Sequence, residues 1–335
     1  MFSPEMTFTK NDAEAAKILA SFLPDRIFDT HCHLIDSSLL PELAENPYRL
    51  MGGSKKYRAE MSQLLNYPKE FRINAIAWPE ASMKDRENGV IDKNNDFLIN
   101  ELHNDDAAVG EIIVHPLDTR EDIEKKLVSP KIRGFKCYHS LSGKEVTWDA
   151  EIADYLPESV WEIANEKNMV ITLHMVRDAA LYDENNMRYI REMSKRFPNA
   201  VLILAHCARS FSSWTGVESV DKLWDRENVF FDFSAVCESP VMIRLLKKIG
   251  VGRCLWGSDW PVCRARGKCI SLGNSFYWIY QKDIDSFRAK TKICDYTIGI
   301  ENLMAIRQAF IISELKENAV EDFFYNNAAK LFETK

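Results

Sequence analysis

Two histidines separated by a single residue stand out near the start of the chain, in the segment Asp29-Thr30-His31-Cys32-His33. Side chains two positions apart on a β-strand point to the same face, so His31 and His33 can present two imidazoles to one point. Paired imidazoles of this kind are ligands for a divalent ion of the zinc type. Asp29 belongs to the same face and is placed to orient a ligand from behind.

Most of the other histidines also stand at the end of an apolar, strand-like run. His139, His174 and His206 each fall at or just after such a run, so five of the seven histidines share this position. Because the carboxyl ends of barrel strands meet at one mouth, we expect these side chains to lie together. We assign His174 to the metal and His206 to proton transfer or substrate polarisation. The alternative, in which both bind a second metal ion, stays open.

A carboxylate completes the candidate site. The last apolar run ends in Trp256-Gly257-Ser258-Asp259-Trp260-Pro261, and closure of a barrel would bring this run next to the first. Asp259 can then serve both as a metal ligand and as the proton acceptor for a metal-activated water. The predicted ligands are therefore His31, His33, His174 and Asp259, and the predicted catalytic residues are Asp259 and His206.

Eight short β-rich runs alternate with longer polar stretches of helical periodicity. The runs occupy residues 26–34, 73–78, 109–117, 133–139, 169–175, 200–207, 228–235 and 253–260. Helices are expected around residues 94–103, 159–168, 185–197, 219–226 and 240–250. Eight parallel strands with alternating helices predict a (β/α)8 barrel of the TIM type, formed as one domain by residues 1–335. A doubly wound open sheet is the alternative, but the chain has no GxGxxG or GxxxxGKS/T phosphate-binding loop to support it.

Two segments are longer than ordinary connections. Residues 35–72 are expected to form an inserted helical subdomain or lid, and residues 261–292 an aromatic-rich excursion after the eighth strand. Both follow strands, so both should overhang the mouth of the barrel. The helical tail from residue 301 onward should close the barrel.

Basic and polar side chains near these strand ends indicate an acidic substrate. Arg177 and Arg209 each follow a strand-end histidine by three residues, and arginines above a pocket suit bidentate pairing with a carboxylate. Lys136, Tyr138 and His139 end the fourth run and are further candidates for substrate contact. A small carboxylic acid is therefore the expected partner.

The DTHCHL motif at residues 29–34, the histidines ending the fifth and sixth runs, and the GSDWP motif at residues 257–261 resemble the amidohydrolase superfamily. The similarity is to the branch of aminocarboxymuconate semialdehyde decarboxylase, related aromatic-acid decarboxylases, lactonases and hydrolases, and it extends to the closing segment NNAAKLF. It implies one divalent ion, zinc in the first place and manganese as the alternative, on the four ligands named above, with His206 as a catalytic histidine that is not a ligand. In binuclear members a carboxylated lysine bridges two ions, and Lys136 is the candidate for that role here.

The expected activity is hydrolysis of a small carboxylate-bearing amide or lactone through a metal-activated water. Non-oxidative decarboxylation of an unsaturated or aromatic acid is the close alternative, because both reactions use the same ligands. A metal-dependent nuclease of the TatD type has a similar histidine motif, but the acidic charge, the chain length and the GSDWP ending argue against it. A barrel with a vestigial site that only binds a ligand is a further alternative.

Composition and charge agree with an enzyme that acts on small molecules. The 335 residues are 46% hydrophobic and 28% charged, with a net charge of −7, which argues against extended nucleic-acid binding. The N-terminus lacks the pattern of a signal peptide and no apolar run has the length of a membrane span, so a cytoplasmic location is expected. The eight scattered cysteines indicate reduced, packed thiols, with a bridge or zinc clip between Cys263 and Cys269 as the open alternative. A homodimer is expected by family analogy alone.

Overall fold

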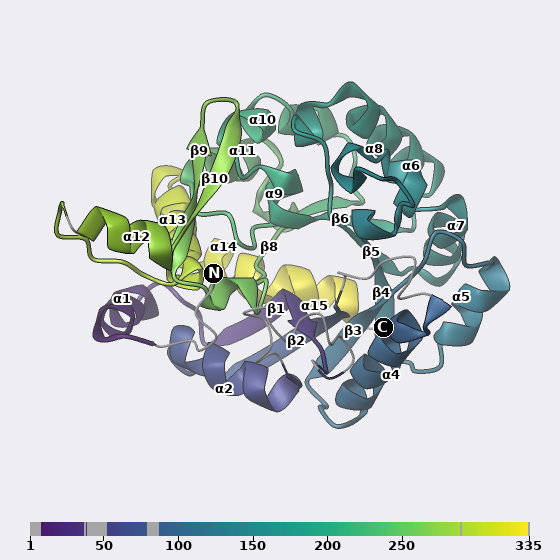
Figure 1. Ribbon diagram of the computed structural model, residues 1–335, viewed down its shortest axis with the longest axis horizontal. Coiled ribbons are helices and arrows are strands. Elements are labelled where there is room, and N and C mark those ends of the chain that lie inside the picture. The colour runs from purple at the N-terminus through teal and green to yellow at the C-terminus, as the bar shows by residue number, and fades with distance from the viewer. Residues whose placement is uncertain (1–7, 37, 39–51, 79–86, 289, 334–335) are drawn as a thin grey trace.

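The computed structural model describes residues 8–36, 38, 52–78, 87–288 and 290–333. Eight parallel strands follow one another in sequence order: β1 Arg26–Leu34, β2 Glu70–Ala77, β3 Ala108–Ile113, β4 Ile132–Cys137, β5 Val170–Leu173, β6 Val201–Leu204, β7 Val229–Asp232 and β8 Cys254–Leu255. Backbone hydrogen bonds from Thr30 N to the Trp256 carbonyl (3.0 Å) and from His33 N to the Trp260 carbonyl (2.8 Å) join the segment around β8 back to β1. The sheet thereby closes into the predicted (β/α)8 barrel (Figure 1).

Helices surround the barrel (Figure 1). They are α1 Lys10–Ala20, α2 Ser54–Leu64, α4 Val90–His103, α5 Arg120–Lys126, α6 Ile152–Tyr155, α7 Glu158–Lys167, α8 Glu184–Arg196, α9 Ala205–Arg209, α10 Ser213–Val217, α11 Ser239–Lys248, α12 Gln281–Arg288, α13 Ile298–Ile312, α14 Glu317–Glu321 and α15 Asn327–Phe332. Four of the five expected connecting helices are present, as α4, α7, α8 and α11. The fifth, at residues 219–226, is only a 3-10 turn at Val220–Leu223. There the Arg253 guanidinium, instead of helical N–H groups, binds the carbonyls of Leu223 (3.1 Å) and Trp224 (2.8 Å).

The C-terminal helices close the amino-terminal end of the barrel. Phe28 of β1 packs against Tyr325 and Phe332, with ring centroids 6.3 Å and 5.6 Å apart. Asn327 donates hydrogen bonds from Nδ2 to the carbonyls of Val251 and Cys254 (2.8 and 3.0 Å). The apolar cluster around Phe28 seals this end, which leaves the opposite mouth for polar side chains.

The two long segments take different forms. Helix α2 lies within residues 35–72 and is fixed to the barrel by Tyr57, whose hydroxyl donates to the Asp29 carboxylate. Residues 39–51 of this expected lid lie outside the described residues, and residues 70–72 already belong to β2. The second segment forms an antiparallel hairpin, β9 Gly267–Leu272 and β10 Ser275–Tyr280, followed by α12, which projects from the ring of helices (Figure 1).

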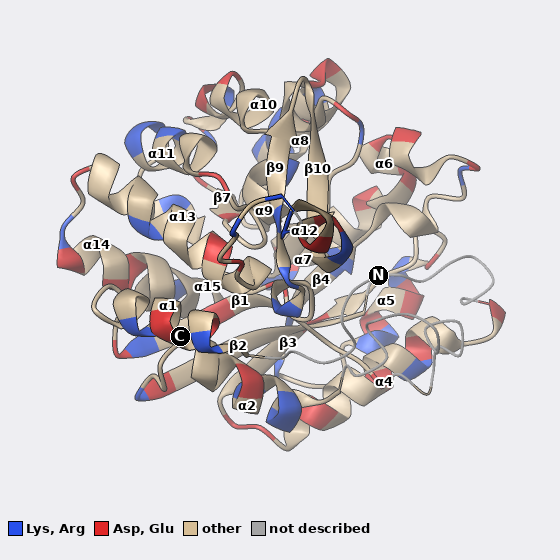
Figure 2. Ribbon diagram, turned by 60° about the vertical axis from the view of Figure 1, so that its left-hand side comes forward, with Lys and Arg blue, Asp and Glu red and all other residues tan. Residues whose placement is uncertain are grey.

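The charged residues and the cysteines are placed as the composition predicts. Acidic and basic residues are interspersed along the surrounding helices (Figure 2). Within the described ranges, no helix is both long and apolar enough to cross a membrane. All eight cysteines are free thiols and all but Cys294 are buried, so no bridge joins Cys263 to Cys269.

A polar side chain from β3 lies inside the barrel. Glu111 is fully buried, and its Oε1 accepts hydrogen bonds from Asn74 Nδ2 (2.6 Å) and Thr172 Oγ1 (2.9 Å). Burial raises the pKa of Glu111 to about 7, and the two hydrogen bonds oppose this shift only in part.

The Glu111→Gln variant is therefore expected to lose part of the pH dependence of stability. Because the pKa of Glu111 rises from 4.5 to about 7 on folding, its contribution to stability is fully present below pH 4.5 and is lost as the pH rises through 7. Relative to the variant, wild-type protein should lose at most about 3 kcal/mol of unfolding free energy over this window. Thermal unfolding at a series of pH values measures the difference, with exposed Glu121→Gln as the control. Parallel curves for wild type and Glu111→Gln would contradict the assignment.

Candidate metal centre

His31 and His33 meet at the carboxyl end of β1. The pairing of this strand with β2 is irregular between Asp29 and Cys32, and the two imidazole rings lie edge to face with their Nε2 atoms 3.1 Å apart. Both side chains are buried, and burial lowers the pKa of each. Neutral imidazoles are the form that binds a metal ion.

Asp259 completes a group of three potential ligands. It follows β8 in a left-handed backbone conformation (φ 53°), and its Oδ1 lies 3.6 Å from His31 Nε2 and 3.5 Å from His33 Nε2. Burial would raise the pKa of the Asp259 carboxyl, but His206 and the two β1 histidines outweigh it, so the pKa lies below its usual value. Asp259 therefore adds an anionic oxygen to two ring nitrogens.

These three side chains fit a divalent ion. Ligand atoms about 2.0–2.1 Å from a tetrahedral zinc ion lie roughly 3.3 Å from one another, and the separations here are 3.1, 3.5 and 3.6 Å. Two imidazoles and one carboxylate are also a donor set of catalytic zinc sites, which keep a position open for water or substrate. The structure thus brings together three of the four predicted ligands.

A second potential group shares His31 but is filled by protein atoms. It combines His31 with His206 and Asp232 of β7. Here Asp232 Oδ2 accepts a hydrogen bond from His31 Nδ1 (3.0 Å), and the Ser234 hydroxyl contacts both Asp232 and His206. Because these atoms already satisfy one another, the candidate ion belongs on the Nε2 side of His31, with His33 and Asp259.

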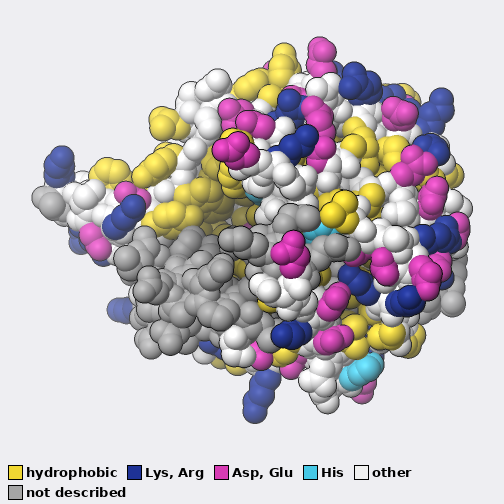
Figure 3. All heavy atoms as spheres, turned by 45° about the vertical axis from the view of Figure 1, so that its right-hand side comes forward, with side chains coloured by type: hydrophobic (Ala, Val, Ile, Leu, Met, Phe, Trp, Pro, Cys, Tyr) yellow, Lys and Arg dark blue, Asp and Glu magenta, His cyan; other side chains and the backbone are white. Residues whose placement is uncertain are grey.

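The candidate centre opens into a pocket of about 430 Å³ at the mouth of the barrel. His174 and His206 line it, with ring centroids 5.1 Å apart. Its aromatic walls are formed by Trp78, Tyr138, Trp148, Phe211, Phe276, Trp278 and Tyr280. The last three belong to β10, so the excursion after β8 forms one wall of the pocket. Figure 3 shows hydrophobic side chains gathered around a hollow on one face of the molecule.

A left-handed turn delivers both His206 and Arg209 to this pocket. The segment labelled α9 in Figure 1 has positive φ angles from His206 through Arg209, between 52° and 61°. Such a conformation costs roughly 1–2 kcal/mol per residue for side chains other than glycine, so neighbouring contacts must hold it. One of them is the hydrogen bond from His206 N to Asp232 Oδ1 (3.1 Å). Strain of this kind is often stored at functional sites.

The family profile described as amidohydrolase matches residues 28–334. The chain belongs to the amidohydrolase family. Its fold is similar to that of 5-carboxyvanillate decarboxylase LigW from Sphingomonas paucimobilis, with a TM-score of 0.60, 13% identity, and coverage of 92% of this chain and 99% of that one. It is also similar to a zinc-bound amidohydrolase from Burkholderia multivorans, with a TM-score of 0.59, 12% identity, and coverage of 92% of this chain and 100% of that one. A third similar structure is the manganese-bound dihydroxybenzoic acid decarboxylase from Polaromonas, with a TM-score of 0.56, 13% identity, and coverage of 92% of this chain and 97% of that one. No curated protein matches the sequence.

Family membership and the buried cluster of histidines and aspartate together make this amidohydrolase a metal-dependent enzyme. The fourth predicted ligand, His174, follows β5 and lies beside Tyr138, with ring centroids 4.7 Å apart. Burial lowers the pKa of His174 well below its usual value, and the nearby His206 and Lys136 lower it further. His174 is not part of the close group of His31, His33 and Asp259, so its role as a ligand stays a prediction.

The candidate residues at the end of β4 and just after it occupy three different positions. Lys136 is buried at the base of the centre, with Nζ 3.3 Å from His31 Nε2, and burial lowers its pKa. Tyr138 lines the pocket. His139 lies behind it, with Nδ1 3.0 Å from Thr147 Oγ1, and is not among the lining side chains. Substrate contact by these residues, and a bridging role for Lys136, stay predictions.

The two predicted substrate arginines differ in their surroundings. Arg177 pairs through Nη1 with Glu151 (2.5 Å) and through Nε with Asp183 (3.5 Å), and it does not line the pocket. Arg209 does line the pocket and forms no ion pair with a described residue. Of the two, Arg209 is therefore the one in a position to meet a ligand.

Two residues behind the site were missed in the sequence. Asp232 and Ser234 stand two positions apart at the end of the seventh apolar run, the same spacing that singled out His31 and His33. That repeated spacing was the available signal. The aromatic walls from Trp148, Phe211 and Phe276 carry no comparable pattern, because they come from loops and the hairpin.

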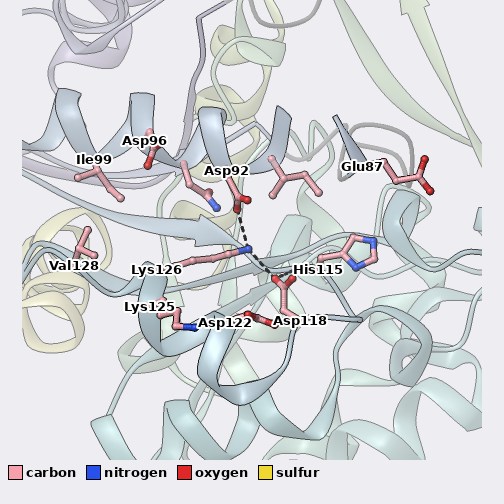
Figure 4. Close-up of a pocket in the computed structure, with 12 residues that line it drawn as sticks. Glu87, Asp92, Asp96, Ile99, His115, Asp118, Asp122, Lys125, Lys126 and Val128 are labelled. Carbon is pink, nitrogen blue, oxygen red and sulfur yellow. Dashed lines mark hydrogen bonds and ion pairs between the residues drawn. The ribbon is translucent and has the colours of Figure 1, made fainter. Parts of the chain in front are cut away.

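A second cavity, of about 510 Å³, lies between α4 and α5 and shares no lining residue with the first (Figure 4). Carboxylates dominate its lining, and Lys126 reaches between Asp92 (3.1 Å) and Asp118 (2.9 Å). Among the described residues, no group with metal-binding spacing occurs in this cavity. The candidate metal ligands His31, His33 and Asp259 lie instead in the first pocket.

Proposed function

We propose that this amidohydrolase hydrolyses a small lactone or amide that carries a carboxylate and a planar, unsaturated or aromatic part. The observation that carries this proposal is Arg209, a buried cation that forms no ion pair with any carboxylate of the described residues and is set among aromatic side chains in the pocket of the candidate metal centre.

The surroundings of Arg209 favour an anionic ligand. Its side chain is 8% exposed, and its hydrogen bond to a described residue runs from Nη1 to the Arg177 carbonyl (2.8 Å). The guanidinium carbon lies 5.3 Å from the ring centroids of both Trp148 and Phe276. Burial lowers the pKa of Arg209, and the charge of Asp178 opposes this shift only in part; a buried cation outside an ion pair costs free energy. A substrate carboxylate would supply the missing partner through a bidentate pair of hydrogen bonds.

The remaining walls favour a flat substrate. Phe211 and Trp278 approach with ring centroids 5.1 Å apart, and Phe211 stacks on His206 at 5.2 Å. Rings in such positions bind planar groups by stacking and exclude water from the reacting atoms.

A divalent ion held by His31, His33 and Asp259, with His174 as the proposed fourth ligand, would polarise the substrate carbonyl and lower the pKa of water. The Asp259 carboxylate, whose pKa is low, accepts the proton of the attacking water as the new carbon–oxygen bond forms. The bond to the leaving oxygen or nitrogen then breaks, and the proton that Asp259 received is transferred to that atom, with His206 as its intermediate carrier. Arg209 holds the distant carboxylate throughout.

Decarboxylation of an aromatic acid is the second candidate, and the aromatic walls favour it. Low-polarity surroundings destabilise a localised carboxylate and so assist its loss as carbon dioxide. Two of the similar structures are decarboxylases of aromatic acids. In this reaction Asp259 or His206 would take a proton from water and deliver it to the ring carbon that the carboxylate leaves.

Product analysis separates the two reactions. Zinc- or manganese-reconstituted enzyme is offered carboxylated lactones and amides in one panel and hydroxybenzoic acids in another, in water enriched in ¹⁸O. Hydrolysis incorporates one labelled oxygen into the product acid, whereas decarboxylation releases carbon dioxide and leaves a solvent-derived hydrogen on carbon. Turnover of lactones or amides supports the proposal, turnover of hydroxybenzoates alone supports the second candidate, and no turnover of either panel rejects both.

Arg209→Lys is expected to raise KM for the carboxylate substrate by about 10–100-fold with a smaller change in kcat. Lysine keeps the charge but loses the bidentate geometry, and a hydrogen bond to a charged group contributes about 1.5–3 kcal/mol. Steady-state kinetics on the substrate found in the panels measures the effect. Arg177→Lys is the matched control, because Arg177 pairs with Glu151 instead of lining the pocket. Equal KM values for wild type and Arg209→Lys would show that the carboxylate binds elsewhere.

A further inference from the structure

Asp232 and Ser234 lie directly behind His31 and His206, outside the pocket lining. Asp232 is fully buried, and it uses both of its carboxylate oxygens. Oδ2 accepts from His31 Nδ1 (3.0 Å). Oδ1 accepts from the backbone N–H groups of His206 (3.1 Å) and Ser234 (3.0 Å) and from the Ser234 hydroxyl. One oxygen of this carboxylate therefore binds the ring of His31, and the other binds the backbone N–H of His206.

The contacts of His31 require a proton on Nδ1. An ionised carboxylate can only accept hydrogen bonds, and the three donors that converge on Asp232 Oδ1 favour the ionised form of this carboxyl. His31 Nδ1 must then be the donor in its 3.0 Å contact with Asp232. The lone pair of the neutral ring is left on Nε2, which faces His33 and Asp259.

The contacts of His206 also require a proton on Nδ1, but through Ser234 instead of Asp232. Its Nδ1 lies 2.9 Å from the Ser234 hydroxyl and 3.2 Å from the Ser234 carbonyl. The hydroxyl proton is already given to Asp232 Oδ1, so toward His206 the hydroxyl oxygen accepts, and a carbonyl oxygen always accepts. His206 Nδ1 must therefore carry a proton, and Nε2 is the nitrogen left for proton transfer.

We propose that Asp232 and Ser234 are positioning residues that hold His31 and His206 in the same Nδ1–H tautomer. In this arrangement His31 Nε2 is set for the ion and His206 Nε2 for the substrate. The roles given to the two histidines rest on the proposed function, but their tautomers can be measured without any substrate.

The Asp232→Asn variant makes the sharpest test, because an amide has one accepting and one donating end. Three donors converge on the Oδ1 position, so the amide oxygen should stay there and the NH2 group should turn toward His31. That group donates, so His31 Nδ1 must become an acceptor and its proton must move to Nε2. The corresponding substitution in the serine-protease triad has this effect on its histidine.

The tautomers are read from long-range ¹H–¹⁵N spectra of metal-free, ¹⁵N-histidine-labelled full-length protein at pH 8, with the resonances of the two rings assigned from the His31→Gln and His206→Gln variants. In wild type, both rings should show a protonated Nδ1 and an unprotonated Nε2. In Asp232→Asn, the two nitrogen shifts of His31 should exchange while those of His206 stay. Zinc affinity, measured by competition with a chromophoric chelator, should fall by about 10–100-fold in this variant. In Ser234→Ala, His206 Nδ1 keeps only its 3.2 Å contact with the carbonyl of residue 234, so the His206 shifts should move part of the way toward a mixture of tautomers. Those of His31 should stay, because its 3.0 Å contact with Asp232 remains when the longer, 3.3 Å contact with the Ser234 hydroxyl is lost.

Ser194→Ala is the matched control, because Ser194 is a buried serine of α8 whose hydroxyl donates to the Ile190 carbonyl (2.6 Å), remote from the site. It should leave both histidine spectra unchanged. A protonated Nε2 on either ring in wild type, or unchanged His31 shifts in Asp232→Asn, would overturn the proposal. If Asp232→Asn fails to fold, the wild-type spectrum and Ser234→Ala still decide it. Correct tautomers in a protein that binds no metal or turns over neither substrate panel would reject the proposed function and leave this inference standing.

Discussion

Replacing His31 with alanine is expected to reduce the bound divalent metal from about one ion per chain to nearly none. His31 is the central ligand of the candidate centre, since its Nε2 lies 3.1 Å from His33 Nε2 and 3.6 Å from Asp259 Oδ1. Without it, only one imidazole and one carboxylate of the close group remain, and Oδ2 of the buried Asp232 loses the donor His31 Nδ1 as well. Plasma mass spectrometry of wild type and variant, each reconstituted with zinc and dialysed, measures the loss.

His103→Ala is the control for this experiment, because His103 is exposed at the end of α4. The control should keep the wild-type metal content. Full metal content in His31→Ala would place the ion elsewhere in the chain. Near two ions per wild-type chain would instead bring Lys136 and His206 into the ligand set, as the binuclear alternative requires.

The barrel could be predicted because its strands have a simple signature. Each of the eight strands is a short apolar run between polar, helix-like segments, and burial on both faces makes such runs easy to recognise. Once a parallel barrel is inferred, residues at the carboxyl ends of its strands are expected to lie close together, because all of these ends share one mouth. That is why His31, His33 and Asp259, far apart in the chain, could be expected to meet, and in the structure they do.

The pocket could be predicted only in part, because its details depend on contacts between distant loops. Arg177 and Arg209 have the same spacing from a strand-end histidine, yet Glu151 from another loop binds Arg177. A left-handed turn carries Arg209 into the pocket, and nothing in a run without glycine predicts such a turn. The sequence of residues 219–226 likewise predicts a helix, because it gives no sign that the distant Arg253 binds the carbonyls of this segment.

Asp259→Asn is expected to lower kcat, per bound ion, by about 10²–10⁴-fold. Asparagine keeps an oxygen in the position that lies 3.5 Å from His33 Nε2, but an amide cannot take a proton from water or give one to carbon. The Asp259 pKa lies below its usual value, so the wild-type side chain is an anion ready to accept a proton at neutral pH. Turnover of the substrate found in the panels, divided by the metal content of the same sample, measures the effect.

Expressing the rate per bound ion separates the two roles assigned to Asp259. Loss of a ligand alone would lower the metal content and leave the remaining loaded enzyme active, whereas loss of the proton acceptor leaves loaded enzyme that turns over slowly. Asp92→Asn, which removes a carboxylate paired with Lys126 in the second cavity, should change neither quantity. Wild-type turnover per ion in Asp259→Asn would assign Asp259 to metal binding only. Proton transfer would then fall to another base that lines the pocket, with His206 as the predicted one.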